Sequence, residues 1–228
     1  MINDTAQLIR NRALWMRGRA FRMVHAAQLG HPGGDFSTID IVATLYFGVL
    51  NYDPQNPTLP SRDRNYQPGV ATNTGPLGHG FPVALGIAIA GITGQTYRAF
   101  VLTGDGELQE GSNWEAAMSA GHRKLENLTL IVDRNRLQQG AGTEETNALD
   151  PLDDRFRAFG FHVEITDGHD VPALLTLLSA PPKGRGKPLC FIANTIKGKG
   201  VSFIENQSAW HHGVPNAAQF AQAMQELV

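Results

Sequence analysis

The chain has 228 residues, of which 42% are hydrophobic and 18% charged, and its formal net charge is −2. This composition predicts a compact globule with a large core rather than a disordered chain. The near-neutral charge, without a dense lysine and arginine block, excludes a basic field for nucleic acid. No apolar run approaches the length of a membrane span, and the first residues lack the order of a signal peptide. We therefore expect a cytoplasmic protein that binds neither nucleic acid nor membrane.

The first part of the chain predicts three helices. Residues 3–29 have the periodicity of a long helix, which the glycine-rich segment 30–34 interrupts. Ser37 is expected to cap a second helix over residues 39–49. A third, strongly apolar helix is expected from Pro76 to about residue 92, where small residues allow close packing.

Strands and helices then alternate to the end of the chain. We expect strands near 99–103, 128–133, 161–165 and 189–194, helices near 112–124 and 170–179, and a closing amphipathic helix over 216–228. This order predicts an α/β fold with a doubly wound, mostly parallel sheet, formed by a single domain over residues 1–228. The only cysteine, Cys190, lies in an apolar run and is predicted to be a buried filler.

Two polar signatures follow neighbouring strands of this predicted sheet. The sequence Gly104-Asp105-Gly106-Glu107 follows one strand, and Asn135 follows the next. Parallel strands of a βαβ unit end on the same edge of the sheet, so we expect Asp105 and Asn135 to lie side by side. Their oxygens are hard ligands that suit Mg²⁺, which completes its shell with phosphate oxygens and water. The glycines and the helix start that follows favour an anion, so the pair predicts a magnesium and diphosphate site.

The same residues carry a family resemblance. Gly-Asp-Gly followed by Asn thirty positions after the aspartate resembles the thiamine diphosphate motif. The longer segment 104–111, together with Trp114-Glu115-Ala116-Ala117, resembles the transketolase branch in particular, and segments 30–34, 74–78 and 197–200 agree with it. The resemblance implies the diphosphate-binding domain of such enzymes, with thiamine diphosphate and Mg²⁺, or Ca²⁺ or Mn²⁺ in its place.

Residue by residue, the resemblance also implies roles. It places the cofactor at Gly75, Leu77, Gly104, Asp105, Gly106, Glu107, Asn135 and His211. It assigns the metal to Asp105, Asn135 and the carbonyl of Leu137. It gives catalytic roles to His31, His211 and Glu110, of which Glu110 resembles an acidic residue that links two active sites across an interface.

Several neighbouring residues remain open at this stage. His212 lies either near the reacting carbon or in solvent, and His79 stands where the family often has glutamine. Glu115 lies either in an interface or on a solvated helix face. Lys197 and Lys199 either face an anion or only solubilise a loop.

The resemblance further implies a missing half. Family members continue into a second α/β domain, which binds the aminopyrimidine ring and supplies the glutamate that activates the cofactor. We therefore expect the N-terminal subunit of a split transketolase, which forms an α2β2 assembly with a C-terminal subunit and uses sugar phosphates. A fragment of a longer enzyme is the alternative.

The sequence departs from the family pattern after Arg64. Relatives follow an Arg-Asp-Arg like that at 62–64 with a Ser-Lys-Gly-His segment and a later Gly-His-Pro, whereas this chain passes directly to Pro68. Two expected histidines are therefore absent. Either the segment is truly deleted, which would weaken catalysis and leave a binding module, or the sequence as it stands lacks it.

Three functions follow from these observations. The first is transfer of a two-carbon ketol unit from a ketose to an aldose. The second is another thiamine diphosphate enzyme, such as a deoxyxylulose-phosphate synthase or a ketoacid dehydrogenase component. The third is a non-catalytic or regulatory cofactor-binding subunit. The segments 106–111 and 197–203 favour the first, and the lack of Gly-x-Gly-x-x-Gly after an early strand disfavours a nicotinamide-binding protein.

Overall fold

The computed structural model describes residues 2–51, 55, 64–66, 75–93, 97–179 and 186–227. In this part of the chain, five parallel strands form one sheet in the order β1-β2-β3-β5-β4. They are β1 (Arg64–Tyr66), β2 (Ala99–Gly104), β3 (Leu128–Arg134), β4 (His162–Asp167) and β5 (Leu189–Asn194). The four predicted strands and the α/β class are confirmed, and the described sheet is wholly rather than mostly parallel.

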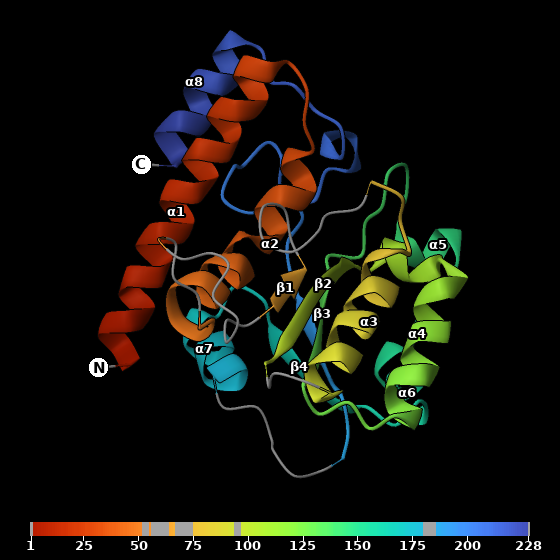
Figure 1. Cartoon of the computed structure of the whole chain (residues 1–228). Coiled ribbons are helices and arrows are strands. Elements are labelled where there is room, and N and C mark those ends of the chain that lie inside the picture. The colour runs from red at the N-terminus through yellow and green to blue at the C-terminus, as the bar shows by residue number, and fades with distance from the viewer. Residues whose placement is uncertain are drawn as a thin grey trace.

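Helices cover both faces of the sheet, which confirms the doubly wound arrangement (Figure 1). One face is covered by α3 (Gly80–Thr93), α4 (Gly111–His122) and α6 (Leu152–Ala158). The other is covered by α2 (Pro32–Thr44), the π-helical turn η1 (Leu45–Val49) and α7 (Val171–Ser179). Outside α2 lie the long helix α1 (Ile2–Ala27) and the last helix α8 (Ala217–Glu226). The short helices η2 (Gly106–Gln109), α5 (Thr143–Thr146) and η3 (Ser208–Trp210) lie in connections.

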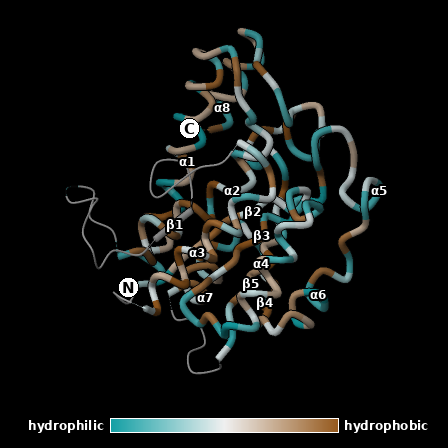
Figure 2. The backbone as a smooth tube through the Cα atoms, turned by 45° about the vertical axis from the view of Figure 1, so that its right-hand side comes forward, coloured by the Kyte–Doolittle hydropathy of each residue, from teal (hydrophilic) through white to brown (hydrophobic). Residues whose placement is uncertain are grey.

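The central strands are buried on both faces. Every residue of β3 is buried, with Leu130 packed toward α3 and α4 and Ile131 toward α2 and α7. A parallel sheet between two helical layers requires such a continuous apolar run, and Figure 2 shows the hydrophobic stretches gathered along these strands. Cys190 in β5 is fully buried, and burial raises the pKa of its thiol, in agreement with the predicted filler role.

The second helix begins earlier than the sequence predicted. It starts at Pro32, because proline is well suited to the first turn of a helix, so Ser37 lies inside α2 and is not its cap. The Ser37 hydroxyl instead bonds the side chain of Asp133. The third helix begins later than predicted, at Gly80, because Gly78 adopts a positive φ of 79° that ends any helical run.

The remaining boundaries agree with the prediction to within a few residues. The last helix begins with a capping box, in which Asn216 and Gln219 each accept the other's backbone N–H. Helix α6 and the three-residue strand β1 were not predicted. Most of the proline-rich stretch 54–60, and the point after Tyr66 where the sequence departs from its family, lie outside the described residues.

Within the described ranges, no helix combines the length and the apolar character needed to cross a membrane. The longest, α1, carries charged residues along its whole length. Its packing against α2 and α8 uses one apolar side, which includes Ile9, Ala13 and Phe21.

The contact between α4 and the end of α6 predicts a strict glycine. A Cβ at Gly121 would lie 1.7 Å from the carbonyl oxygen of Phe159, whereas a Cβ at Gly86 in α3 would meet nothing within 4 Å. We expect Gly121→Ala to lower the free energy of unfolding by about 1–3 kcal/mol through overpacking. Gly86→Ala should raise it by up to about 1 kcal/mol through helix propensity. Urea denaturation of both variants checks this, and equal shifts in the two would contradict it.

Candidate functional site

The carboxyl ends of β2 and β3 meet as the sequence predicted. Gly104 lies opposite Asp133 in the parallel register, so Asp105 and Asn135 emerge beside each other at this edge. Asp105 is 1% exposed and Asn135 8% exposed. A cavity of about 420 Å³ opens here, lined by Gly34, Thr38, Leu77, Gly104, Asp105, Gly106, Glu107, Gln109, Glu110, Asp133, Asn135, Leu137, Gln138, Gln139, Lys197 and His211. Of the predicted site residues, Gly75 and His31 alone are not among them.

Asp105 is held from below by a buried arginine. Its Oδ2 accepts the backbone N–H of Arg136 at 2.7 Å and a guanidinium N–H of Arg134 at 3.1 Å. Its Oδ1 accepts the adjacent N–H of Gly106 at 2.9 Å. Burial raises the pKa of Asp105, outweighing the hydrogen bond from Arg136 and the charge of Arg134. A further cation beside this carboxylate would therefore favour its ionised form.

Asn135 is oriented by a tight turn. Its Oδ1 accepts the N–H of Leu137 at 3.0 Å, and its amide group donates to Oδ2 of Asp133 at 2.9 Å. Between them, Arg136 adopts a positive φ of 65°, which is uncommon for a residue other than glycine. The turn thus presents the oxygens of Asn135 and Leu137 on the cavity side of β3, where both residues line the wall.

Asp133 is a buried carboxylate that sequence reasoning missed. Besides the Asn135 amide, it accepts the hydroxyls of Ser37 at 2.6 Å and of Thr195. It lies inside the apolar strand β3, and a charged residue at the end of such a strand was the available signal. With three donors bound, this carboxylate fixes the positions of α2, the Asn135 turn and the segment after β5.

Glu107 and Glu110 lie on the opposite side of the cavity. Oε1 of Glu107 accepts the N–H of Gly78 at 3.0 Å, which ties the turn before α3 to the segment after β2. Leu77 in this turn is 59% exposed, whereas Gly75 lies two residues further from the wall. Glu110 is exposed at the start of α4, and Glu115 is exposed within the helix.

Lys197 is buried in the cavity wall rather than solvated. It is 2% exposed, and its Nζ donates to the Leu137 carbonyl at 3.3 Å and lies 3.2 Å from Nδ1 of His211. Burial lowers the pKa of Lys197, although the nearby charges of Asp133 and Asp105 oppose that shift. Lys199, by contrast, is partly exposed and lies 3.6 Å from Glu205.

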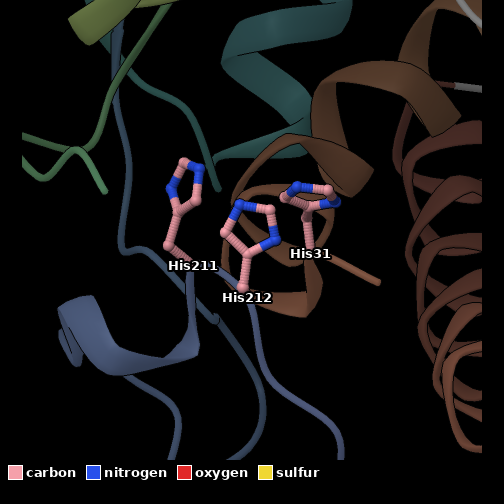
Figure 3. Close-up of side chains that lie close together, drawn as sticks. All are labelled: His31, His211 and His212. Carbon is pink, nitrogen blue, oxygen red and sulfur yellow. The ribbon is translucent and has the colours of Figure 1, made fainter. Parts of the chain in front are cut away.

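Three histidines meet beside the cavity (Figure 3). His31 precedes α2, and His211 and His212 follow η3. The ring centroid of His31 lies 3.9 Å from that of His212 and 5.6 Å from that of His211. Burial lowers the pKa of His211 to about 4, assisted by the charge of Lys197, and the pKa of His31 is lowered for the same reasons. Both imidazoles are therefore neutral near pH 7.

A chain of hydrogen bonds connects the outer helices with Lys197. Arg17 in α1 binds Asp40 in α2 through both carboxylate oxygens, at 2.6 and 3.1 Å. Asp40 accepts Nδ1–H of His169 at 2.8 Å, and Nε2 of His169 accepts the N–H of Ile196 at 2.9 Å. Burial opposes ionisation of Asp40, but the bonds from His169 and Arg17 outweigh it and lower the pKa of this carboxyl. The chain ends one residue before Lys197.

The donor set fits a hard cation and a diphosphate. A carboxylate, an amide oxygen and a carbonyl oxygen line one wall, at Asp105, Asn135 and Leu137, and these are the ligand types that Mg²⁺ takes. A Cβ built at Gly104 would meet nothing within 4 Å, so the glycine leaves open space against the backbone. Lys197 adds a positive charge for phosphate oxygens.

Comparison with known proteins assigns this arrangement to a family. Residues 65–227 match the family described as "Transketolase, thiamine diphosphate binding domain". The chain belongs to the transketolase family. It is 40% identical to one of the subunits of apulose-4-phosphate transketolase from Actinobacillus succinogenes, over 87% of each protein. Transketolase from Campylobacter jejuni superposes with a TM-score of 0.87 and 27% identity, covering 97% of this chain and 43% of that one.

The relatives differ in whether they carry residues that this transketolase chain lacks. The A. succinogenes alignment runs over 243 positions but uses 87% of 228 residues, or about 198, so about 45 positions have no counterpart here. Transketolase-like protein 1 from Bos taurus is 34% identical over 232 positions that use 99% of this chain, with hardly any such gaps. The chain spans 39% of the length of that relative.

The Asp133 cluster predicts that one hydroxyl supports the site. Ser37→Ala removes a donor to a buried carboxylate and should lower the free energy of unfolding by about 1–3 kcal/mol. Thr176, whose hydroxyl bonds an exposed helix carbonyl in α7, provides the matched control. Thr176→Ala should change stability by less than about 0.5 kcal/mol. Chemical denaturation checks the pair, and a Ser37 variant as stable as its control would refute the supporting role.

Proposed function

We propose that this chain is the thiamine diphosphate-binding half of a two-subunit transketolase, active with a partner that supplies the second α/β domain. The observation that carries the proposal is the buried Asp105 beside Asn135 at the edge of the cavity. The family match supports it, as does the A. succinogenes relative, whose name describes one subunit of a transketolase. The whole described fold, read with residues 1–228, would then serve as one cofactor-binding domain.

Asp105, Asn135 and the Leu137 carbonyl would hold the divalent ion, which we propose to be Mg²⁺, with Ca²⁺ or Mn²⁺ as substitutes. The backbone at Gly104 and Gly106 leaves room for the diphosphate, and Glu107 keeps the facing turn in place. The bound cofactor supplies the electron sink that ketol transfer needs. The protein's own contribution is to bind, orient and polarise.

The histidines would act on the transferred unit. A charged Lys197 can only donate, so Nδ1 of His211 accepts from it, and Nε2 carries the ring proton. His211 thereby presents an N–H donor to the cavity, suited to an oxygen that gains negative charge. His31 and His212 lie against it and can hold substrate hydroxyls or move a proton.

A partner subunit is supported by exposed apolar side chains. Val83 on α3 is 41% exposed, and Met118 on α4 is 59% exposed, as is Leu77 at the cavity rim. Such residues on two packed helices suit a protein interface. We propose an α2β2 assembly in the cytoplasm that acts on sugar phosphates, with Glu110 at the interface between active sites.

A second candidate is a non-catalytic or regulatory cofactor-binding subunit. It is favoured by the positions that the A. succinogenes relative carries and this chain does not. The two candidates share cofactor binding and differ in turnover. Purification of the tagged chain from its host, followed by a ketol-transfer assay with and without the co-purified partner, distinguishes them.

Partner dependence gives a direct prediction. The purified chain alone should show no ketol transfer, because the activating glutamate of the second domain is not supplied. Adding the partner should restore it. Turnover by the chain, shown free of other proteins by mass spectrometry, would refute the split-enzyme proposal, and an inactive assembly would favour the non-catalytic alternative.

The metal assignment predicts a selective loss of cofactor binding. Asp105→Asn should weaken Mg²⁺-dependent thiamine diphosphate binding by the assembled enzyme at least tenfold, or about 1.4 kcal/mol, because a charged hard ligand is lost. Asp150→Asn is the control, since Asp150 lies 3.0 Å from the same Arg134 but does not line the cavity. Calorimetry of both variants checks the difference. Equal affinities would sink the assignment.

His31 should affect the rate more than cofactor affinity. His31→Ala in the assembled enzyme is expected to lower turnover by about 10²–10⁴, as for a positioned acid–base group. Cofactor affinity should change little, because Asp105 and Asn135 remain intact. His122, exposed on α4, provides the matched control variant. Normal turnover of His31→Ala, or loss of cofactor binding, would contradict the role.

A further inference from the structure

The three histidines beside the cavity form a nitrogen-rich cluster of their own. His31 comes from the start of α2, and His211 and His212 come from the segment after η3, almost two hundred residues later. One ring nitrogen from each lies within 4.8 Å of the others (Figure 3). Among the described residues, this is the group of histidine, cysteine or acidic side chains close enough to share one ion.

The backbone holds the two segments together. The N–H of Gly198 donates to the carbonyl of Gly33 at 2.8 Å, directly after His31 and Pro32. A Cβ on Gly33 would lie 2.8 Å from the carbonyl oxygen of Trp210, so only glycine allows this approach. The cluster therefore rests on close backbone packing of α2 against the segment 196–212, and not on the chance meeting of long side chains.

The distances suit a tetrahedral transition-metal ion after small side-chain movements. Zn²⁺ binds imidazole at about 2.0–2.1 Å, so two of its nitrogen ligands lie about 3.4 Å apart. The cluster must contract by about 1.4 Å at most from its 4.8 Å limit. His31 and His212 are exposed and can turn, while His211 is partly buried and fixed.

The ligand chemistry separates this cluster from the oxygen site at Asp105. Imidazole nitrogens suit zinc, copper and nickel, whereas Mg²⁺ and Ca²⁺ take oxygen ligands. Lys197 contacts Nδ1 of His211, so an ion would approach the opposite nitrogen, Nε2. Lys197 also has the Leu137 carbonyl at 3.3 Å as a second partner.

We propose that His31, His211 and His212 form a binding site for a divalent transition-metal ion of the zinc class, with the fourth ligand taken from solvent. Three imidazoles and one open position are a known ligand set for Zn²⁺. His211 also lines the cavity, so a bound ion would withdraw it, and His31, from the substrate. The site stands on its own geometry; only this inhibitory effect rests on the proposed function.

Metal titration of the full chain, after chelator treatment and in excess Mg²⁺, tests the site without cofactor, partner or substrate. Calorimetry with Zn²⁺ and the visible spectrum with Co²⁺ are the two readouts. We expect one ion per chain, with the intense absorption of a tetrahedral Co²⁺ site. His31→Gln and His212→Gln should each weaken binding by about tenfold or more.

His122→Gln, which changes an exposed histidine outside the cluster, should bind the ion like the unchanged chain. Circular dichroism and the melting temperature confirm that each variant is folded. Zn²⁺ affinity that is unchanged in both cluster variants, or equally reduced in the His122 control, would overturn the proposal. Neither result would bear on thiamine diphosphate binding through Asp105, so the two proposals fail separately.

Discussion

The buried guanidinium of Arg134 is the interaction on which the rest of the site depends. It reaches Asp105 at 3.1 Å, Glu144 at 2.7 Å and Asp150 at 3.0 Å, and its side chain is 1% exposed. One charge thus places the carboxylate at the end of β2 and the loop that carries α5. Burying it costs several kcal/mol, which is recovered only while all its partners are in place. Asp105 is therefore oriented from beneath, with its outer side left to the cavity.

The sequence predicted those parts of the site that follow from strand ends. Asp105 and Asn135 are brought together by the parallel register alone, and the register follows from two apolar runs with a helix between them. Lys197 could not be assigned in this way. Its burial depends on how the segment after β5 packs onto α2, through the contact of Gly198 with Gly33. Nothing in the local glycine-rich pattern distinguishes a buried lysine from a solvated one.

The errors in the predicted elements have similar causes. Ser37 has the residue type of a helix cap, but Pro32 supplies an earlier start, and the serine is instead used across the core by Asp133. The strand β1 has three residues, too few for a period of two to be visible. Helix α6 is a short amphipathic segment whose Phe156 and Leu152 enter the core only in the folded context.

The hydrogen-bonded chain from Arg17 through Asp40 and His169 to Ile196 has a dynamic consequence. It joins α1 and α2 to the backbone next to Lys197, so the outer helix layer and the cavity wall belong to one cooperative unit. Local opening of α1 must break the Arg17 bonds, and the exposed Asp40 would then release His169. Amide hydrogens around Arg17 should accordingly exchange with solvent more slowly once the distant cavity is filled, although no ligand touches that helix.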